Sequence, residues 1–135
     1  MLKADLQASG EIKNLGKNDK AANQTFGRLM IYEVKLYLNQ NFTRPDIEKR
    51  TNEIASIFNT SSKTLNRAFT KAYGITVSKL IKKLKMEKAL LLLKQNKTAL
   101  SEVCEAVGYK DVYNFSRKFK EYHGFSAKEV PANSL

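Results

Sequence analysis

Residues 65–76 read LNRAFTKAYGIT, and fifty positions later residues 115–126 read FSRKFKEYHGFS. In both stretches an apolar residue is followed by arginine after two positions, phenylalanine after four and glycine after nine. Each stretch follows a short apolar segment, at residues 53–58 and 102–107, and a tight polar turn whose second copy is one residue longer. A short helix, a tight turn and a second amphipathic helix form a helix-turn-helix. The internal repeat therefore predicts a pair of helix-turn-helix units in one chain.

Capping residues and apolar spacing place the second helix within each repeat. Ser61 and Asp111 are suitable N-caps, while Gly74 and Gly124 suit the C-terminal ends. Between the repeats, residues 76–95 carry apolar residues at helical spacing among lysines, and about twenty helical residues span about 30 Å. No stretch shows the sustained alternation that is typical of a strand. We expect an all-α fold of about seven helices, with two helix-turn-helix subdomains joined by a long linker helix.

The composition changes along the chain and divides it into four parts. Residues 1–24 are rich in lysine, asparagine, glutamine, glycine and alanine, as in a flexible arm or linker. We expect the first subdomain over residues 25–75, the linker helix over 76–96 and the second subdomain over 97–135. Pro45 suits the first turn of a helix, although residues 46–50 equally fit a separate turn. Ser126 and Glu129 form a capping-box pattern that predicts a last short helix.

The chain is strongly basic, and most of its charge lies on the repeated part. Its 135 residues include 24 Lys and Arg against 13 Asp and Glu, which gives a net charge of +11. Residues 43–135 hold 18 of these cations and nine of the acids, so +9 of the +11 lies there. Clustered lysine and arginine favour nucleic acid as the partner, because binding releases the counterions that phosphates condense.

Residue types exclude several other kinds of site. With one Cys and one His, the chain has neither an internal disulfide nor a metal cluster built from these ligands. Cys104 is expected as a small buried hydrophobe rather than a redox sensor. No nucleophile and base pattern or glycine-rich phosphate loop supports catalysis, so we expect no enzyme activity and no cofactor. The most apolar run, Ala89–Leu93, is too short to cross a bilayer and the N-terminus lacks a signal-peptide pattern, so we expect a cytoplasmic protein without a membrane partner.

The outward face of each second helix follows from counting about 100° per residue from its buried stripe. The outward residues are Lys63, Asn66, Arg67 and Thr70 in the first copy, and Tyr113, Ser116, Arg117 and Lys120 in the second. Arginine can read guanine and asparagine adenine through paired hydrogen bonds, each pair giving about 1–3 kcal/mol of discrimination. Tyr113 can pack on a thymine methyl group or bond a phosphate. Major grooves on one face of B-DNA recur about every 34 Å, close to the expected linker length, so a monomer is predicted to read two of them.

Three segments between residues 26 and 130 resemble the DNA-binding domain of AraC/XylS-type bacterial transcription regulators. The first is Ile54-Ala55 followed by Ser61-x3-Leu65-x-Arg67-x-Phe69-x4-Gly74, and the second is Lys85-Met86-x2-Ala89-x2-Leu92-Leu93. The third resembles the family's signature pattern and reads Val103-Cys104-x2-Val107-Gly108-Tyr109-x-Asp111-x3-Phe115-Ser116-Arg117-x-Phe119-Lys120-x4-Gly124. Lys85 stands where the linker pattern usually has arginine, and the loss of a planar fork is expected to weaken a contact between helices.

The resemblance implies sequence-specific binding to double-stranded DNA through homeodomain-like subdomains, at a promoter or operator where RNA polymerase is recruited or blocked. The base-reading residues that it implies are Lys63, Asn66, Arg67, Val112, Tyr113, Ser116 and Arg117. It places phosphate contacts at helix starts near Ser62 and Lys110, and at Lys118 and Lys120. The implied location is the bacterial cytoplasm, in association with the nucleoid. Many family members add a ligand-sensing domain, for which the residues before Phe26 are too few, so the chain is expected to be either a small stand-alone member or a piece of a longer protein. No small-molecule site is evident in the sequence.

Two other functions stay open at the level of sequence. A basic helical protein can bind RNA, although Phe69, Phe115 and Phe119 fall on buried stripes and not on platforms for unstacked bases. A protein-partner adaptor would keep the same fold without sequence-specific readout of DNA. Competition between duplex DNA and RNA distinguishes RNA binding from DNA binding. Neutralising Arg67 and Arg117 distinguishes an adaptor, whose function stays intact, from a DNA reader, which loses affinity at two half-sites.

Overall fold

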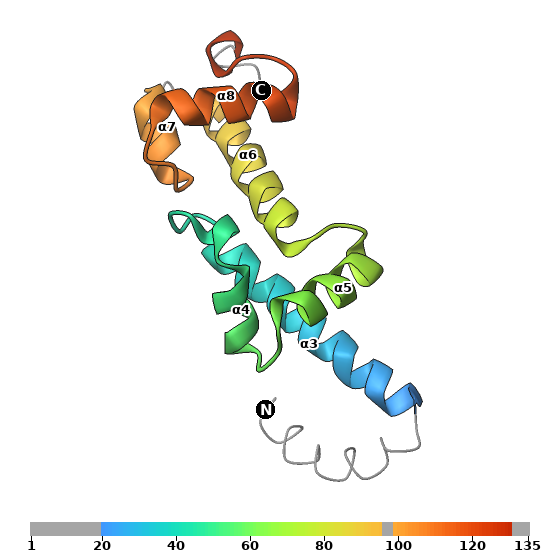
Figure 1. Ribbon diagram of the computed structural model, residues 1–135. Helices are drawn as coiled ribbons and strands as arrows, with labels where there is room; N and C mark the ends of the chain where they lie inside the picture. The colour runs from blue at the N-terminus through green and yellow to red at the C-terminus, as the bar shows by residue number, and fades with distance from the viewer. Residues whose placement is uncertain (1–19, 96–98, 131–135) are drawn as a thin grey trace.

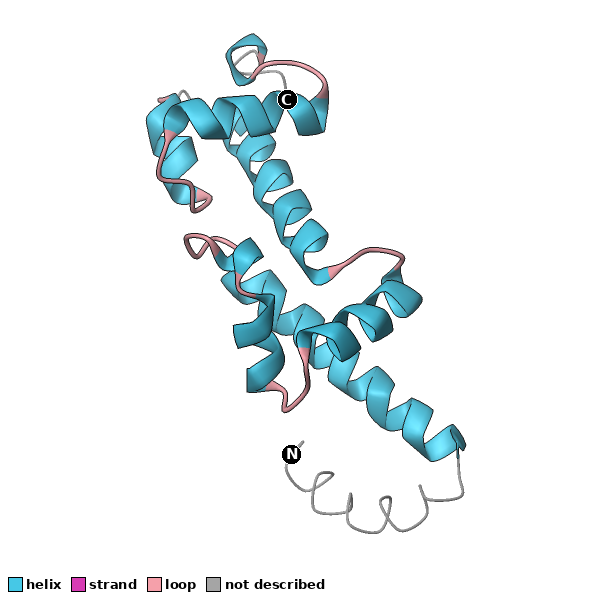
Figure 2. Ribbon diagram, viewed as in Figure 1, coloured by secondary structure: helices cyan, strands magenta, loops and turns pink. Residues whose placement is uncertain are grey.

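All regular structure in the computed structural model, which describes residues 20–95 and 99–130, is helical (Figure 2). These residues form six α-helices and two 3-10 helices, which confirms the all-α prediction. In chain order they are α3 (Lys20–Asn41), η1 (Ile47–Lys49), α4 (Thr51–Ile57), α5 (Ser62–Tyr73), α6 (Val77–Gln95), α7 (Leu100–Ala106), α8 (Val112–His123) and η2 (Ala127–Glu129). The pairs α4–α5 and α7–α8 form the predicted helix-turn-helix units, and α6 runs between them (Figure 1).

The two turns repeat one another at the level of the backbone. Asn59 follows the end of α4 with a φ of 57°, and Gly108 follows the end of α7 with a φ of 89°. In each turn the next N–H donates to the carbonyl oxygen five residues earlier, at 3.0 Å. These bonds close the C-terminal ends of α4 and α7 in the same way. Four residues separate α4 from α5 and five separate α7 from α8, so the second turn is the longer one, as expected.

Each subdomain has its own hydrophobic core, and α6 contributes to both. The buried residues of the first core are Ile31, Val34, Leu38, Ile47, Ile54, Ala55, Leu65, Phe69, Val77 and Ile81. Those of the second core are Met86, Ala89, Val103, Cys104, Val107, Phe115, Phe119 and Ala127. Within α6, Val77 and Ile81 therefore serve the first core, while Met86 and Ala89 serve the second. The linker helix is a packed member of both halves, not an exposed spacer.

The helix that leads into the first unit begins earlier than expected. α3 starts at Lys20, so residues 20–24, predicted as part of a flexible arm, already belong to a helix of 22 residues. Further along α3, Ile31, Val34 and Leu38 are buried in the first core and fix the helix against α5. The expectations for residues 1–19, 96–98 and 131–135 lie outside the described residues.

The segment between α3 and α4 resolves the alternative that the sequence leaves open. Pro45 does not start a helix, because the next residue, Asp46, takes a left-handed φ of 59° that a continuing helix does not allow. The separate turn over residues 46–50 is observed instead, with η1 inside it and α4 beginning at Thr51. Near residue 126, the N–H of Ser126 donates to Oε1 of Glu129 at 3.1 Å ahead of η2, which is one of the two bonds of the predicted capping box.

Candidate nucleic-acid interface

The helices α5 and α8 occupy equivalent places in the two units, and each begins at a side-chain cap. Ser61 Oγ accepts the N–H of Thr64 at 3.1 Å, and Asp111 Oδ1 accepts the N–H of Tyr113 at 3.0 Å. Each helix fully buries one apolar pair, spaced one helical turn apart, in the core of its own half. The exposed side chains on the opposite side of each helix are therefore available for contacts outside the fold.

The outward face of α5 carries most of the residues predicted there. Lys63, Arg67 and Thr70 are exposed on it. Asn66 is half-buried, and its Oδ1 accepts the N–H of Val77 at 3.1 Å. This bond caps the first residue of α6, so Asn66 joins the first helix-turn-helix to the linker helix. Sequence reasoning missed that role because the two residues lie 11 positions apart and belong to different helices.

The outward face of α8 combines an exposed aromatic residue with an oriented arginine. Tyr113 is 78% exposed although it is large and apolar. Arg117 is exposed and lies along the helix surface, where it donates to Oδ1 of Asn114 at 2.9 Å and to Oε2 of Glu121 at 3.5 Å. Lys120 is also exposed. Asn114 was missed by the sequence reasoning, and its place three residues before Arg117 is the signal that would have identified it.

The remaining predicted contact residues lie at the margins of the two faces. Ser62, Ser116 and Lys118 are half-buried. Val112 packs against the second core, so its side chain is engaged within the protein and we do not assign it a base contact. Lys110 has a side chain that is 76% exposed, and its Nζ lies 3.8 Å from Oδ2 of Asp46 in the first subdomain.

A basic cleft of about 320 Å³ lies between the two subdomains. Its lining includes Lys110, Arg117 and Lys118 from the second helix-turn-helix, and Lys49 and Lys82 from η1 and α6. The other charged side chains of the lining are three carboxylates, so cations are in excess. The structure thus joins three predicted contact residues to two lysines that sequence reasoning did not select. A duplex phosphate is the kind of group that such a cleft attracts.

The single cysteine has a structural environment. Cys104 is buried in the second core, and its thiol donates to the carbonyl oxygen of Tyr109 at 3.3 Å. Burial, together with the nearby carboxylates of Asp111 and Glu105, raises the pKa of the Cys104 thiol. A buried thiol with a raised pKa is unreactive, because the thiolate is the reactive form.

Two other kinds of site are absent from the described residues. No group of three or more His, Cys, Asp or Glu residues within residues 20–95 and 99–130 is arranged to hold a metal ion. In the same part of the chain, no helix combines the length and the apolar character needed to cross a membrane.

Comparison with known proteins gives the family. A sequence family described as a helix-turn-helix domain matches residues 54–132. The uncharacterized HTH-type transcriptional regulator YfiF of Bacillus subtilis is 31% identical over 97 residues, which cover 72% of this chain and 30% of that protein. The chain spans about a third of the length of the curated relatives that it matches.

Solved structures agree with the fold described above. The C-terminal domain of AraT, a response regulator from Geobacillus stearothermophilus, matches with a TM-score of 0.70 at 29% identity, over 75% of this chain and 82% of that chain. A transcriptional regulator with an AraC-type DNA-binding domain from Chromobacterium violaceum matches with a TM-score of 0.54 at 25% identity, over 59% of this chain and 71% of that chain. Together with the repeated helix-turn-helix units, these matches establish that the chain belongs to the AraC-type family of helix-turn-helix DNA-binding domains.

Proposed function

We propose that the chain is a sequence-specific, double-stranded DNA-binding transcription regulator that inserts α5 and α8 into two adjacent major-groove segments. The observation that carries the proposal is the repetition of a capped helix with an exposed polar and basic face at both ends of one linker helix. The linker helix α6 has 19 residues and is therefore about 28 Å long. That length is close to the distance of about 34 Å between major grooves on one face of B-DNA, so one copy of the chain can make both contacts.

The base contacts follow from the exposed side chains of the two helices. Arg67 and Arg117 occupy equivalent positions in the repeat, and a guanidinium can donate two hydrogen bonds to one guanine. Lys63 and Thr70 supply further donors to the first groove. Tyr113 offers its ring to a thymine methyl group in the second groove.

Three of the predicted contacts receive different roles in the proposal. Asn66 is assigned to the cap of α6, because its carbonyl oxygen already accepts a backbone N–H. Ser116 and Val112 are half-buried and lie at the edges of the reading face of α8. Asn66 and Val112 therefore help to position helices rather than read a base, and Ser116 lies at the edge of the reading face.

Phosphate contacts are proposed for the helix starts and for the cleft between the subdomains. The residues that we assign to the backbone are Ser62, Lys110, Lys118 and Lys120, with Lys49 and Lys82 added from the cleft. Such contacts hold the protein on the duplex but carry no sequence information. Their number predicts affinity that falls steeply with salt, because each neutralised phosphate releases counterion.

The regulatory step is proposed from the family and not from a site in this chain. The matched relative YfiF is named as a transcriptional regulator. We propose that the bound chain stands at a bacterial promoter or operator, on the nucleoid in the cytoplasm, and contacts RNA polymerase there. Transcription from a promoter that carries the selected site, with purified polymerase and with or without the protein, tests this step. An unchanged transcript level contradicts it.

The readout is tested by replacing one arginine at a time. Arg67→Ala should relax base preference in one half of the selected site, and Arg117→Ala in the other half, each by about 1–3 kcal/mol of discrimination. Arg28→Ala is the control for loss of one charge, because Arg28 is exposed and belongs to α3 and to neither reading helix. If both test variants instead weaken all sequences equally, the two arginines contact phosphates and the assignment of base readout is wrong.

A further inference from the structure

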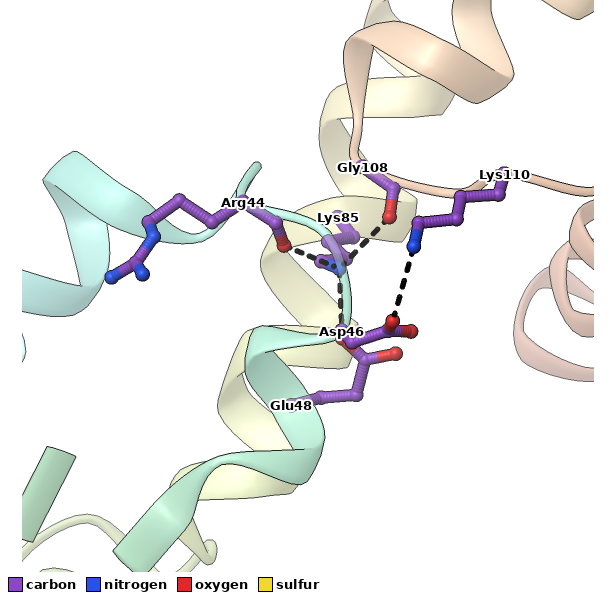
Figure 3. Close-up of polar contacts among 6 residues, drawn as sticks. All are labelled: Arg44, Asp46, Glu48, Lys85, Gly108 and Lys110. Carbon is purple, nitrogen blue, oxygen red and sulfur yellow. Dashed lines mark hydrogen bonds and ion pairs between the residues drawn. The ribbon is translucent and has the colours of Figure 1, made fainter. Parts of the chain in front are cut away.

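A buried lysine sits where the two cores meet. Lys85 is fully buried on α6, between Ile81 of the first core and Met86 of the second. Its ammonium group donates to Oε1 of Glu48 at 2.7 Å (Figure 3). The sequence predicted a weaker helix contact here, because lysine lacks the planar fork of arginine. The structure shows that Lys85 nevertheless makes a short, charge-assisted bond that is shielded from water.

The other acceptors of Lys85 come from both halves of the protein. Its Nζ donates to the carbonyl oxygen of Arg44, in the first subdomain, at 3.2 Å. It also donates to the carbonyl oxygen of Gly108, in the turn of the second helix-turn-helix, at 3.5 Å (Figure 3). The ring centroid of Tyr109 lies 4.9 Å from the same ammonium group. We call these contacts of Lys85 with Glu48, Arg44 and Gly108 the inter-subdomain clasp.

Backbone packing and a second ion pair reinforce the clasp. A Cβ atom added at Gly108 would lie 2.3 Å from the carbonyl oxygen of Thr43, so the turn of the second unit rests directly on the backbone that joins α3 to η1 in the first subdomain. Further out, Lys110 Nζ lies 3.8 Å from Oδ2 of Asp46 (Figure 3). The turn of the second helix-turn-helix therefore touches the segment between α3 and α4 of the first subdomain, and both subdomains also pack on α6.

A fixed contact between the two subdomains affects DNA binding, because the distance between two half-sites changes only by whole base pairs. One added base pair moves the next groove by about 3.4 Å and rotates it by about 34° around the duplex. If the relative position of α5 and α8 varies by less than this step of one base pair, the two helices can fit only one spacing of half-sites. A buried ion pair contributes little net stability compared with apolar residues, and in some proteins buried polar groups instead specify one arrangement of the elements that they join.

We propose that Lys85 is a positioning residue that sets the spacing between the two half-sites that the protein accepts. The inference rests on the proposed function, in which α5 and α8 read adjacent groove segments. Lys85 touches no DNA in this account. It acts by fixing the second unit against the first, so that α5 and α8 have one relative position before DNA is met.

The first test measures spacing selectivity with the full chain. The affinity for the selected site is compared with the affinity for sites with one base pair inserted or deleted between the half-sites. Unaltered protein should lose about tenfold or more, the loss that one base contact represents. The double variant Lys85→Met/Glu48→Gln removes both buried charges and should lose threefold or less. Lys83→Met, at an exposed lysine of the same helix, is the matched control and should behave like the unaltered protein.

The second test measures the relative position of the two helices without DNA. Spin labels at Thr70→Cys and Lys120→Cys, both exposed, report the distance between α5 and α8 in a chain whose buried Cys104 is replaced by Ala. The clasp predicts a narrow distance distribution that broadens in the double variant. If the double variant fails to fold, Glu48→Gln alone weakens the charge-assisted bond at nearly constant volume and is measured by both methods.

The outcomes separate the inference from the function beneath it. If the protein selects no two-block site, the proposed function is wrong and the spacing claim falls with it. If a two-block site is selected but the clasp variants keep both the spacing profile and the narrow distance distribution, only the inference about Lys85 is overturned. A lost spacing preference with unchanged preference inside each half-site supports it.

Discussion

Among substitutions in the turns, we expect Gly108→Ala to lower the free energy of unfolding the most. Gly108 has a φ of 89°, and an added Cβ would lie 2.3 Å from the carbonyl oxygen of Thr43 and 3.1 Å from that of Arg44. Both neighbours are backbone atoms, so relief requires the two subdomains to move apart. Gly124 provides a matched control, because its φ is 83° but nothing lies within 4 Å of its Cβ position.

The magnitude can be divided into two parts. An alanine forced into the left-handed region costs about 1–2 kcal/mol, and this part is common to both glycines. Crowding in a well-packed contact costs a further 1–3 kcal/mol, roughly, and applies only at Gly108. We therefore expect Gly108→Ala to lower the free energy of unfolding by about 2–5 kcal/mol, and Gly124→Ala by about 1–2 kcal/mol.

Urea denaturation followed by far-ultraviolet circular dichroism measures both losses. The midpoint should fall further for Gly108→Ala than for Gly124→Ala, with similar slopes in the two curves. Equal losses of stability in the two variants would mean that the turn at Gly108 does not rest on the backbone of the first subdomain.

Three further predictions concern single side chains. Burial, with the nearby Glu48 carboxylate, raises the pKa of Tyr109 well above its ordinary value of 10, so the fold favours the neutral phenol. The stability that this preference contributes is fully present below about pH 10 and is lost as the pH rises toward the pKa of the folded state. Between pH 9 and 11 the urea midpoint should therefore fall more for the unaltered protein than for Tyr109→Phe. Asn66→Ala leaves the N–H of Val77 without its acceptor and should cost about 0.5–2 kcal/mol in urea denaturation, whereas Asn66→Asp keeps the acceptor; equal losses in the two variants contradict the capping role. Asn114→Ala removes the 2.9 Å bond that orients Arg117 and should reduce discrimination in the second half-site by about 1 kcal/mol in competition binding, with the first half-site unchanged as the internal control.

Local patterns explain why much of the fold could be predicted from the sequence. The apolar stripes around Phe69 and Phe119 repeat at fifty residues, and each stripe has a capping residue ahead of it. Ser61 and Asp111 cap α5 and α8 as predicted. The N–H groups whose bonds they accept lie only two or three positions further along the chain. Interactions of that range are written into consecutive residues, so the sequence reveals them without knowledge of the fold.

Contacts between distant residues explain most of what the sequence could not provide. Lys85 meets Glu48 across 37 positions and Gly108 across 23, and no periodicity marks these partners. The exposed faces of α5 and α8 were found by counting, but counting cannot tell that Asn66 turns toward the start of α6. Burial against a neighbouring element decides such cases, and it depends on the assembled fold.

Selection of duplex DNA from a random library by the protein, with the salt dependence measured on the enriched site, tests whether α5 and α8 read DNA sequence. We expect an enriched site of about 15–20 base pairs with two unlike blocks, centred about one helical turn apart, bound by a single copy of the chain. Tight binding without any enriched sequence, lost as salt rises, would mean that the protein contacts only the backbone and would contradict readout by α5 and α8.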